Sequence, residues 1–62
     1  MKNLRKYRKA AKLTGEQVAR EIGVSSQTYW NWEQGRNEPG ASKVKPLADL
    51  FGVSVEELLK EE

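Results

Sequence analysis

The spacing of apolar residues predicts two short helices joined by a tight turn in the first half of the chain. In a helix over residues 15–22, Val18, Ala19 and Ile22 fall on one side when successive residues are turned by about 100°. Gly23 follows this helix and can take the left-handed conformation that ends a helix without steric cost. We therefore expect the chain to turn immediately after Ile22.

A second helix is expected over residues 26–34. Tyr29 and Trp32 fall on the side that must rest on the first helix, whereas the opposite side is polar except for Trp30. The small side chain of Ala19 allows two helices to cross closely at a short turn. Such pairs occur in many small helical proteins, so the turn alone is compatible with an ordinary helical hairpin as well as with a helix-turn-helix.

The same pattern predicts three more helices, and turn chemistry marks their ends. Capping boxes are expected where Thr14 precedes Gln17 and where Ser54 precedes Glu57, and Gly52 is expected to end the fourth helix. The five expected helices cover residues 2–12, 15–22, 26–34, 43–51 and 55–61.

The apolar residues suffice for one small core. A chain of this length buries only about 60% of the surface that its unfolded form exposes. We therefore expect one all-α domain over residues 1–62, without a second domain. The residues expected in its core are Leu4, Leu13, Val18, Ile22, Val24, Tyr29, Trp32, Leu47, Leu50, Phe51, Val53, Leu58 and Leu59.

Together these segments resemble the phage-repressor-like, Cro/Xre-type family of helix-turn-helix transcriptional regulators. TGEQVAREIGVSSQTYWNWE is similar to the helix-turn-helix itself and KNLRKYRKAAKLT to the family's first helix. QGRNEP resembles the loop after the reading helix, LADLFGVS the fourth helix and its exit, and VEELLK the last helix. The resemblance implies a five-helix, lambda-repressor-like domain that binds specific double-stranded DNA with residues 26–34 in the major groove, as a transcriptional regulator or repressor.

The family's base-reading positions correspond to Ser26, Gln27 and Asn31. The amide of Gln27 can donate and accept at once, as the N6/N7 edge of adenine requires, although a solvated surface glutamine is the alternative. Asn31 has the same chemistry with shorter reach, and Ser26 can contact a base or a phosphate. Trp30 is expected to meet a thymine methyl or the DNA backbone, or else to pack within the protein beside the loop at Arg36.

Phosphate contacts are expected on both sides of the reading helix, from amides at helix starts, hydroxyls and cations. Many relatives carry glutamine at position 15, so Gly15 offers only its backbone amide, and we expect weaker positioning on DNA without altered base preference. The candidates are Thr14, Gly15, Ser25, Thr28, Gln34, Arg36, Asn37 and Lys43, with Arg5 and Lys9 on the first helix.

Two further expectations follow from the resemblance. Arg8 and Glu33 correspond to residues that form a buried or half-buried ion pair in several relatives. We expect this pair to orient the reading helix more than to stabilise the fold, because desolvation offsets much of the attraction. Pro46 departs from the family's continuous fourth helix, and because proline suits only a first helical turn, we expect this helix to begin nearer Lys45 than Lys43.

The charges are separated along the chain, although the net charge is only +2. Residues 1–45 carry ten Lys and Arg against four Asp and Glu, a balance of +6. Residues 46–62 carry one Lys against five Asp and Glu, a balance of −4. One end of the molecule is therefore expected to attract polyanions. Six of the cations lie in the first twelve residues, and at least half of these are expected to be solvated surface charges.

Composition excludes several classes of chemistry. The chain has no Cys and no His, which excludes disulfides, zinc–thiolate sites and histidine-based catalysis. We expect no enzymatic activity, metal, cofactor or small-molecule ligand. No apolar run approaches the roughly 20 residues of a membrane span, and no signal-peptide segment follows the basic amino terminus. A cytoplasmic protein, associated with the nucleoid when bound, and a chain complete as a binding module are expected.

Other functions stay open at this stage. An antitoxin-like or adaptor module could bind a protein through Trp30, Tyr7 and the acidic last helix, whereas an engineered DNA binder would share the first function. The basic helix expected over residues 2–12 could in principle bind an anionic membrane. This alternative is disfavoured, because the helix has only a narrow apolar stripe and the core of the domain needs it.

Val53, Val55 and Leu59 form a modest apolar patch. A monomer or a weak homodimer on a twofold DNA site is therefore expected.

Overall fold

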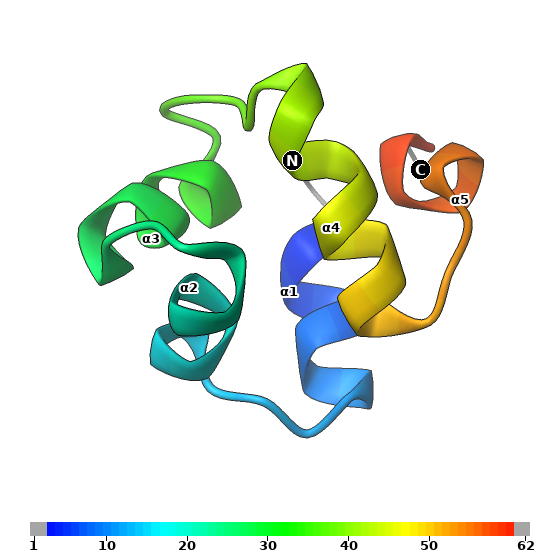
Figure 1. Ribbon diagram of the computed structural model, residues 1–62, viewed down its shortest axis with the longest axis horizontal. Helices are drawn as coiled ribbons and strands as arrows, with labels where there is room; N and C mark the ends of the chain where they lie inside the picture. Colours follow the sequence, from blue (N-terminus) through cyan, green and yellow to red (C-terminus); the bar gives the residue numbers. More distant parts are fainter. Residues whose placement is uncertain (1–2, 61–62) are drawn as a thin grey trace.

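Residues 3–60 are described by the computed structural model, and they form five helices (Figure 1). The helices are α1 (Asn3–Ala10), α2 (Gly15–Ile22), α3 (Ser26–Gln34), α4 (Ala41–Phe51) and α5 (Val55–Leu59). No strand occurs within the described residues. The expected all-α fold is confirmed.

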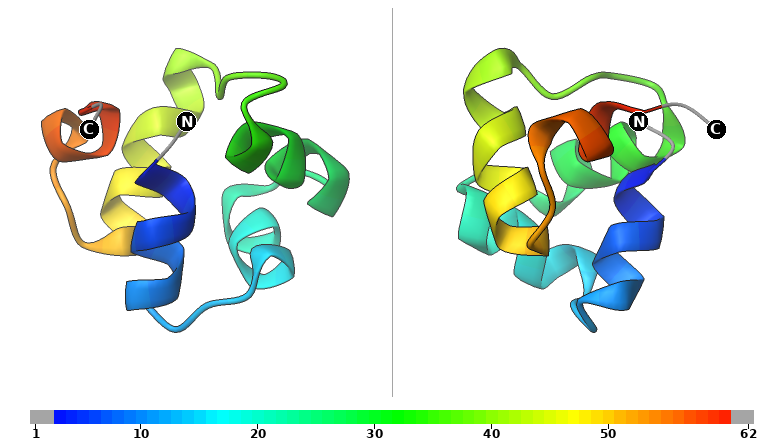
Figure 2. Two further views of the ribbon diagram at one scale, coloured as in Figure 1. Left: turned by 180° about the vertical axis from the view of Figure 1, so that it is seen from behind. Right: turned by 90° about the vertical axis from the view of Figure 1, so that its right-hand side faces the viewer.

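The helices form two groups that share one core. α2 and α3 pack against each other on one side of the molecule, and α1, α4 and α5 make up the other side (Figure 2). α2 also contacts α4, and α1 contacts α3, so the two groups are joined by both connections. α5 packs on α1 and α4. One outer surface of α3 is therefore left without a covering helix.

The helix-turn-helix lies where the sequence pattern predicts it, and both of its helices have the expected bounds. The Thr14 hydroxyl accepts from the Gln17 amide at 3.1 Å, and the Gln17 side chain accepts from the Thr14 amide at 2.8 Å. Gly23 has φ 86°, in the left-handed region, and its amide donates to the Ala19 carbonyl at 2.8 Å. Ser25 caps α3 by accepting from the Thr28 amide at 3.1 Å. Local capping therefore determines this turn.

α1 ends earlier than expected. Its last residue is Ala10 rather than residue 12, and the expected residue 2 lies outside the described residues. Lys12 takes a left-handed conformation with φ 61°. The Leu13 amide donates to the Arg8 carbonyl and the Lys12 amide to the Lys9 carbonyl, at 3.2 and 3.0 Å. This Schellman-type ending uses a lysine where glycine is usual, so no local signal marked it.

The expected start of α4 is wrong. The helix begins at Ala41, and Pro46 is its sixth residue rather than part of its first turn. Proline cannot donate to the Ser42 carbonyl, but Ser42 and Pro46 are both exposed, so water can reach that carbonyl. Val44 packs against the core, and the Lys43 ammonium donates to the Ile22 carbonyl at 3.5 Å. These tertiary contacts hold the first turn of α4 in place despite the proline.

The core agrees with the expected residues with one exception. The prediction that Leu59 lies in the core is wrong, because its side chain is 53% exposed while Leu58 faces the interior. α5 ends at Leu59 instead of continuing through Lys60, and residue 61 lies outside the described residues. The buried apolar residues are Leu4, Val18, Ala19, Ile22, Tyr29, Trp32, Leu47, Ala48 and Leu58, with Leu13, Val24, Leu50, Phe51 and Val53 half-buried around them.

Asn3 is a buried polar residue that the sequence pattern did not single out. Its side-chain amide donates to the carbonyl of Lys60 and to that of Glu57, the latter at 3.3 Å. These carbonyls lie at the end of α5, so Asn3 ties the first helix to the last. Its hydrogen bonds offset the cost of burying an amide among apolar residues.

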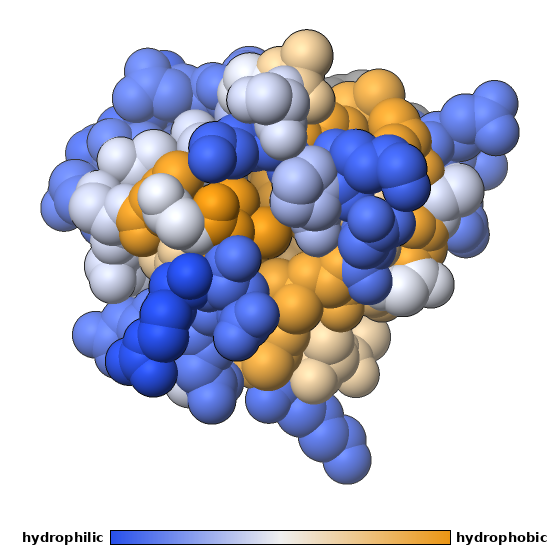
Figure 3. Space-filling view, in the orientation of Figure 1, coloured by the Kyte–Doolittle hydropathy of each residue, from blue (hydrophilic) through white to orange (hydrophobic). Residues whose placement is uncertain are grey.

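Within residues 3–60, no helix is long and apolar enough to cross a membrane. In the orientation of Figure 3, apolar surface extends across the middle of the molecule, whereas polar side chains cover most of the side formed by α2 and α3.

Candidate nucleic-acid interface

The outward surface of α3 presents two side-chain amides one helical turn apart. Gln27 is exposed and Asn31 is half-buried. The Gln27 side chain donates to the Asn31 side-chain oxygen at 3.2 Å. This hydrogen bond aligns the two amides along the helix while leaving donors and acceptors of both for a ligand. Ser26, at the start of the same helix, is half-buried.

The opposite side of α3 is anchored in the core. Tyr29 has no exposed surface and Trp32 is 5% exposed. Ala19 of α2 is 1% exposed, so a methyl group fills the close crossing of the two helices. The buried side of α3 thereby fixes which residues face outward.

Trp30 packs within the protein. Its indole lies against Gly15, the first residue of α2, because a Cβ added there would sit 2.6 Å from the Trp30 Cζ2 atom. The Arg8 guanidinium carbon lies 5.3 Å from the centre of the indole ring. Trp30 is consequently half-buried, and Gly15 is buried. The internal packing of Trp30 therefore involves Gly15 and Arg8, and not the loop at Arg36 where internal packing was expected.

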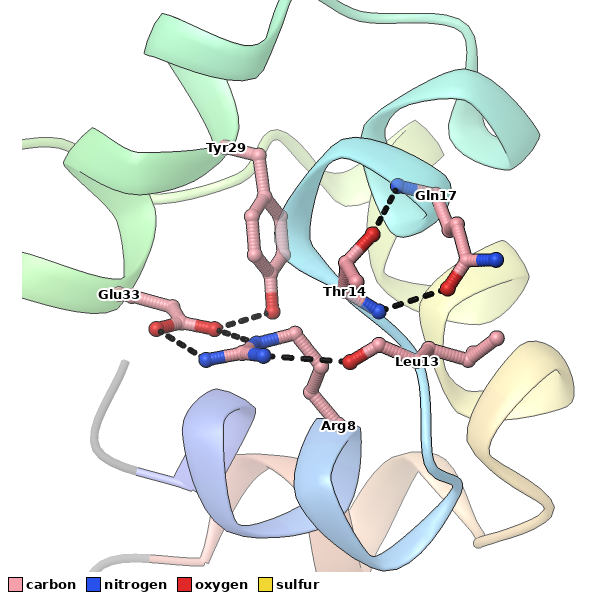
Figure 4. Close-up of polar contacts among 6 residues, drawn as sticks. All are labelled: Arg8, Leu13, Thr14, Gln17, Tyr29 and Glu33. Carbon is pink, nitrogen blue, oxygen red and sulfur yellow. Dashed lines mark hydrogen bonds and ion pairs between the residues drawn. The ribbon is translucent and has the colours of Figure 1, made fainter.

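Arg8 of α1 and Glu33 of α3 form an ion pair between these two helices (Figure 4). Arg8 Nε donates to Glu33 Oε2 at 2.6 Å, and the two side chains are only 12% and 6% exposed. Arg8 Nη1 also donates to the Leu13 carbonyl at 3.1 Å. The pair therefore joins α1, α3 and the segment that leads into α2. Its hydrogen bond to Glu33 raises the pKa of Arg8 further above its ordinary value.

Tyr29 is a third member of this cluster, although the pattern of apolar positions predicts it only as a core residue. Its hydroxyl donates to Glu33 Oε2 at 2.6 Å (Figure 4). The available signal was the spacing of Tyr29 and Glu33, four residues apart on one helix. Burial, followed by the hydrogen bond to Glu33 and the charge of Glu33, raises the pKa of the Tyr29 phenol above its ordinary range.

This raised pKa predicts a loss of stability at alkaline pH. Above the ordinary phenol pKa of about 10, unfolded chains ionise at Tyr29 while folded ones keep it neutral. The free energy of unfolding should then fall by about 1.4 kcal/mol per pH unit until the pH reaches the folded pKa. Urea titrations from pH 8 to 11.5 measure the loss, and Tyr29→Phe should remove this component. Tyr7→Phe is the matched control outside the cluster, and an unchanged alkaline loss in Tyr29→Phe would contradict the assignment.

Several of the expected phosphate-contacting residues lie near the ends of α3. Gln34, Arg36 and Asn37 are exposed at and after the end of α3. Thr14 and Ser25 are exposed at the starts of α2 and α3, where their hydroxyls already serve as helix caps.

Other candidates already have contacts within the protein, or lie on a different helix. The Thr28 hydroxyl accepts from the Ser25 hydroxyl at 2.9 Å. Lys43 is half-buried, and its ammonium lies at the carboxyl end of α2. Arg5 and Lys9 are exposed on α1.

Two helices joined at Gly23, with a buried crossing and an uncovered polar surface on the second helix, define a helix-turn-helix DNA-binding domain. The chain belongs to this family, because a family model described as Helix-turn-helix matches residues 4–58. The resemblance to Cro/Xre-type regulators is thereby confirmed.

Curated relatives cover nearly the whole chain. It is 43% identical over 56 residues to the uncharacterized HTH-type transcriptional regulator YobD of Bacillus subtilis, and 39% identical over 59 residues to MJ0272 of Methanocaldococcus jannaschii, another uncharacterized HTH-type transcriptional regulator. It is 36% identical over 58 residues to the cryptic phage CTXphi transcriptional repressor RstR of Vibrio cholerae.

These alignments cover 90%, 94% and 94% of this chain. They span 50% of YobD, 89% of MJ0272 and 52% of RstR, so the chain corresponds to about half the length of two of these relatives. No solved structure matches the chain at comparable significance.

Proposed function

We propose that the domain recognises a specific sequence in double-stranded DNA by placing α3 in the major groove. The observation that carries this proposal is the aligned pair of amides, Gln27 and Asn31, on the uncovered surface of α3. A major groove admits an α-helix, and base edges there present distinct patterns of donors and acceptors.

The amide pair suggests how bases are read. Gln27 gives one N–H to Asn31 and keeps a second N–H and its oxygen, which match N7 and N6–H of adenine. Asn31 keeps both of its N–H groups, and Ser26 contributes a hydroxyl at the start of the helix. We assign base contacts to these three residues. Trp30, also on α3, packs against Gly15 and Arg8 beside these residues.

Phosphate contacts on both sides of α3 would hold the helix in a fixed position along the major groove. Backbone amides at the start of a helix bind anions, and exposed cations add charge. The proposed contacts are Thr14, Gly15, Ser25, Thr28, Gln34, Arg36, Asn37 and Lys43, with Arg5 and Lys9 on α1.

The domain acts by occupying a site and catalyses no reaction in this proposal. Control of transcription, most simply by repression, is the expected outcome for the protein that contains it, as in the relative named as a repressor. A cytoplasmic location and a weak homodimer on a twofold site belong to the same proposal.

The proposal is tested by selecting bound sequences from a random duplex pool with the wild type and with Gln27→Ala. Gln27→Ala should lose preference at one base pair and weaken binding to the selected site by about tenfold, since a bidentate contact discriminates by about 1–3 kcal/mol. Gln34→Ala is the matched control, an exposed glutamine on the same helix, and should weaken binding without altering preference. An unchanged preference in Gln27→Ala would refute the assignment.

A further inference from the structure

Gly15 and Trp30 fit together so closely that each constrains the other. A Cβ at position 15 would lie 2.6 Å from Cζ2, 2.7 Å from Cη2 and 3.1 Å from Cε2 of Trp30. Contacts below about 3 Å exceed what close packing tolerates, so a larger residue would have to displace the indole. Among the described residues, positive φ occurs at Lys12 and at three other glycines, but not at Gly15. The indole, rather than the backbone conformation, is therefore what requires glycine here.

The same indole is held by a second contact. The Arg8 guanidinium lies 5.3 Å from the ring centre, within the range of a cation–π interaction. Arg8 is itself fixed by Glu33 at 2.6 Å and by the Leu13 carbonyl at 3.1 Å. Trp30 thus links α3 to the start of α2, through Gly15, and to α1, through Arg8.

The start of α2 carries backbone donors that the helix does not use. The Gln17 amide donates to the Thr14 hydroxyl, and the Val18 amide donates to the Thr14 carbonyl. The amides of Gly15 and Glu16 precede the first intrahelical bond, as they do at any helix start. The proposed function assigns the Gly15 amide to a DNA phosphate.

From this arrangement we infer that Trp30 is a positioning residue for DNA binding. Its indole takes the space of a side chain at position 15 and sets the distance between the phosphate-binding start of α2 and the reading amides of α3. Contacts to phosphates determine the register in which bases are read, so this distance governs affinity. The inference rests on the proposed function and adds a role that requires no contact between Trp30 and a base.

The test is a double-mutant cycle on the selected DNA site. Gly15→Ala keeps the backbone amide, but the added Cβ meets the Trp30 indole and should move the start of α2 away from its phosphate. Loss of this hydrogen bond to a charged group should weaken binding by about tenfold. Trp30→Ala should weaken binding by a similar factor, but Gly15→Ala should then cost almost nothing more, because the added methyl no longer meets the ring. Gly40→Ala is the matched control, since nothing lies within 4 Å of its added Cβ.

Two readouts separate positioning from general stability and from direct reading. In a series of duplexes, each phosphate in turn is replaced by a neutral methylphosphonate. One of these replacements should weaken binding by the wild type but not binding by Gly15→Ala or Trp30→Ala. Base preference in the random pool should be unchanged in both variants. All measurements are made where circular dichroism shows each variant to be folded. If Trp30→Ala does not fold, Trp30→Leu replaces it, because leucine lacks the atoms that approach position 15.

Independent effects of the two substitutions, or an unchanged affinity in folded Trp30→Ala, would overturn the inference. A changed base preference in Trp30→Ala would also overturn it and would indicate that Trp30 contacts a base directly. Gln27→Ala distinguishes this failure from failure of the proposed function. If Gln27→Ala loses preference at one base pair while Gly15 and Trp30 are uncoupled, the DNA-reading proposal stands and only the positioning role falls.

Discussion

Replacing Arg8 with methionine should lower the free energy of unfolding by about 3–5 kcal/mol, because it leaves the Glu33 carboxylate buried without its cation. The Glu33 side chain is only 6% exposed, and of its partners only the Tyr29 hydroxyl would remain. A domain of this size has a total stability of about 3–9 kcal/mol. Arg8→Met should therefore lose about a third or more of its free energy of unfolding, as measured by urea and thermal unfolding followed by circular dichroism.

Two controls identify the buried charge as the cause. Arg8→Met/Glu33→Gln should recover most of the loss, since the glutamine oxygen can still accept from Tyr29 and no charge is buried. Lys45→Met breaks an exposed ion pair, whose side chains are 73% and 65% exposed, and should cost no more than about 1 kcal/mol. A loss below about 1 kcal/mol in Arg8→Met would show that the ion pair is not effectively buried.

DNA binding should weaken by about 100-fold when monovalent salt rises from 50 to 200 mM. Four of the proposed phosphate contacts are cations, namely Arg5, Lys9, Arg36 and Lys43. Four neutralised phosphates give a slope of log affinity against log salt of about −3.6 per bound domain. Fluorescence anisotropy on the selected duplex across this range measures the slope.

Single cations can be tested within the same titration. Arg36→Gln should make the slope shallower by about 0.9, which corresponds to one phosphate. Lys45→Gln is the matched control, because Lys45 is paired with Asp49 at 3.2 Å and is not among the proposed contacts. An affinity for the duplex that hardly changes with salt would contradict the proposed contacts between these cations and phosphates.

The helix-turn-helix could be predicted to the residue because its signals are local. Thr14, Gly23 and Ser25 each act on backbone groups within five residues, so their effects are readable from spacing alone. The buried positions Val18, Tyr29 and Trp32 follow from helical period in the same way. The exposure of Gln27 follows because it lies opposite them on α3.

Helix ends elsewhere depended on contacts between distant segments. Lys12 takes a conformation that glycine would normally mark, and Pro46 lies inside α4 where proline usually stops a helix. The first turn of α4 persists because Val44 packs on the core and Lys43 reaches the end of α2. Intrinsic preference is a weak influence when tertiary packing opposes it.

The sequence by itself determined which residues form α2 and α3 and which of their sides face inward, because helical period and capping act over a few residues. The Arg8–Glu33 pairing was expected only through a family resemblance. Tertiary structure alone decided that the Asn3 side chain donates to carbonyls at the end of α5 and that Trp30 packs against Gly15. Whether such side chains meet depends on the crossing of helices that are separate in sequence, and local periodicity does not specify that crossing.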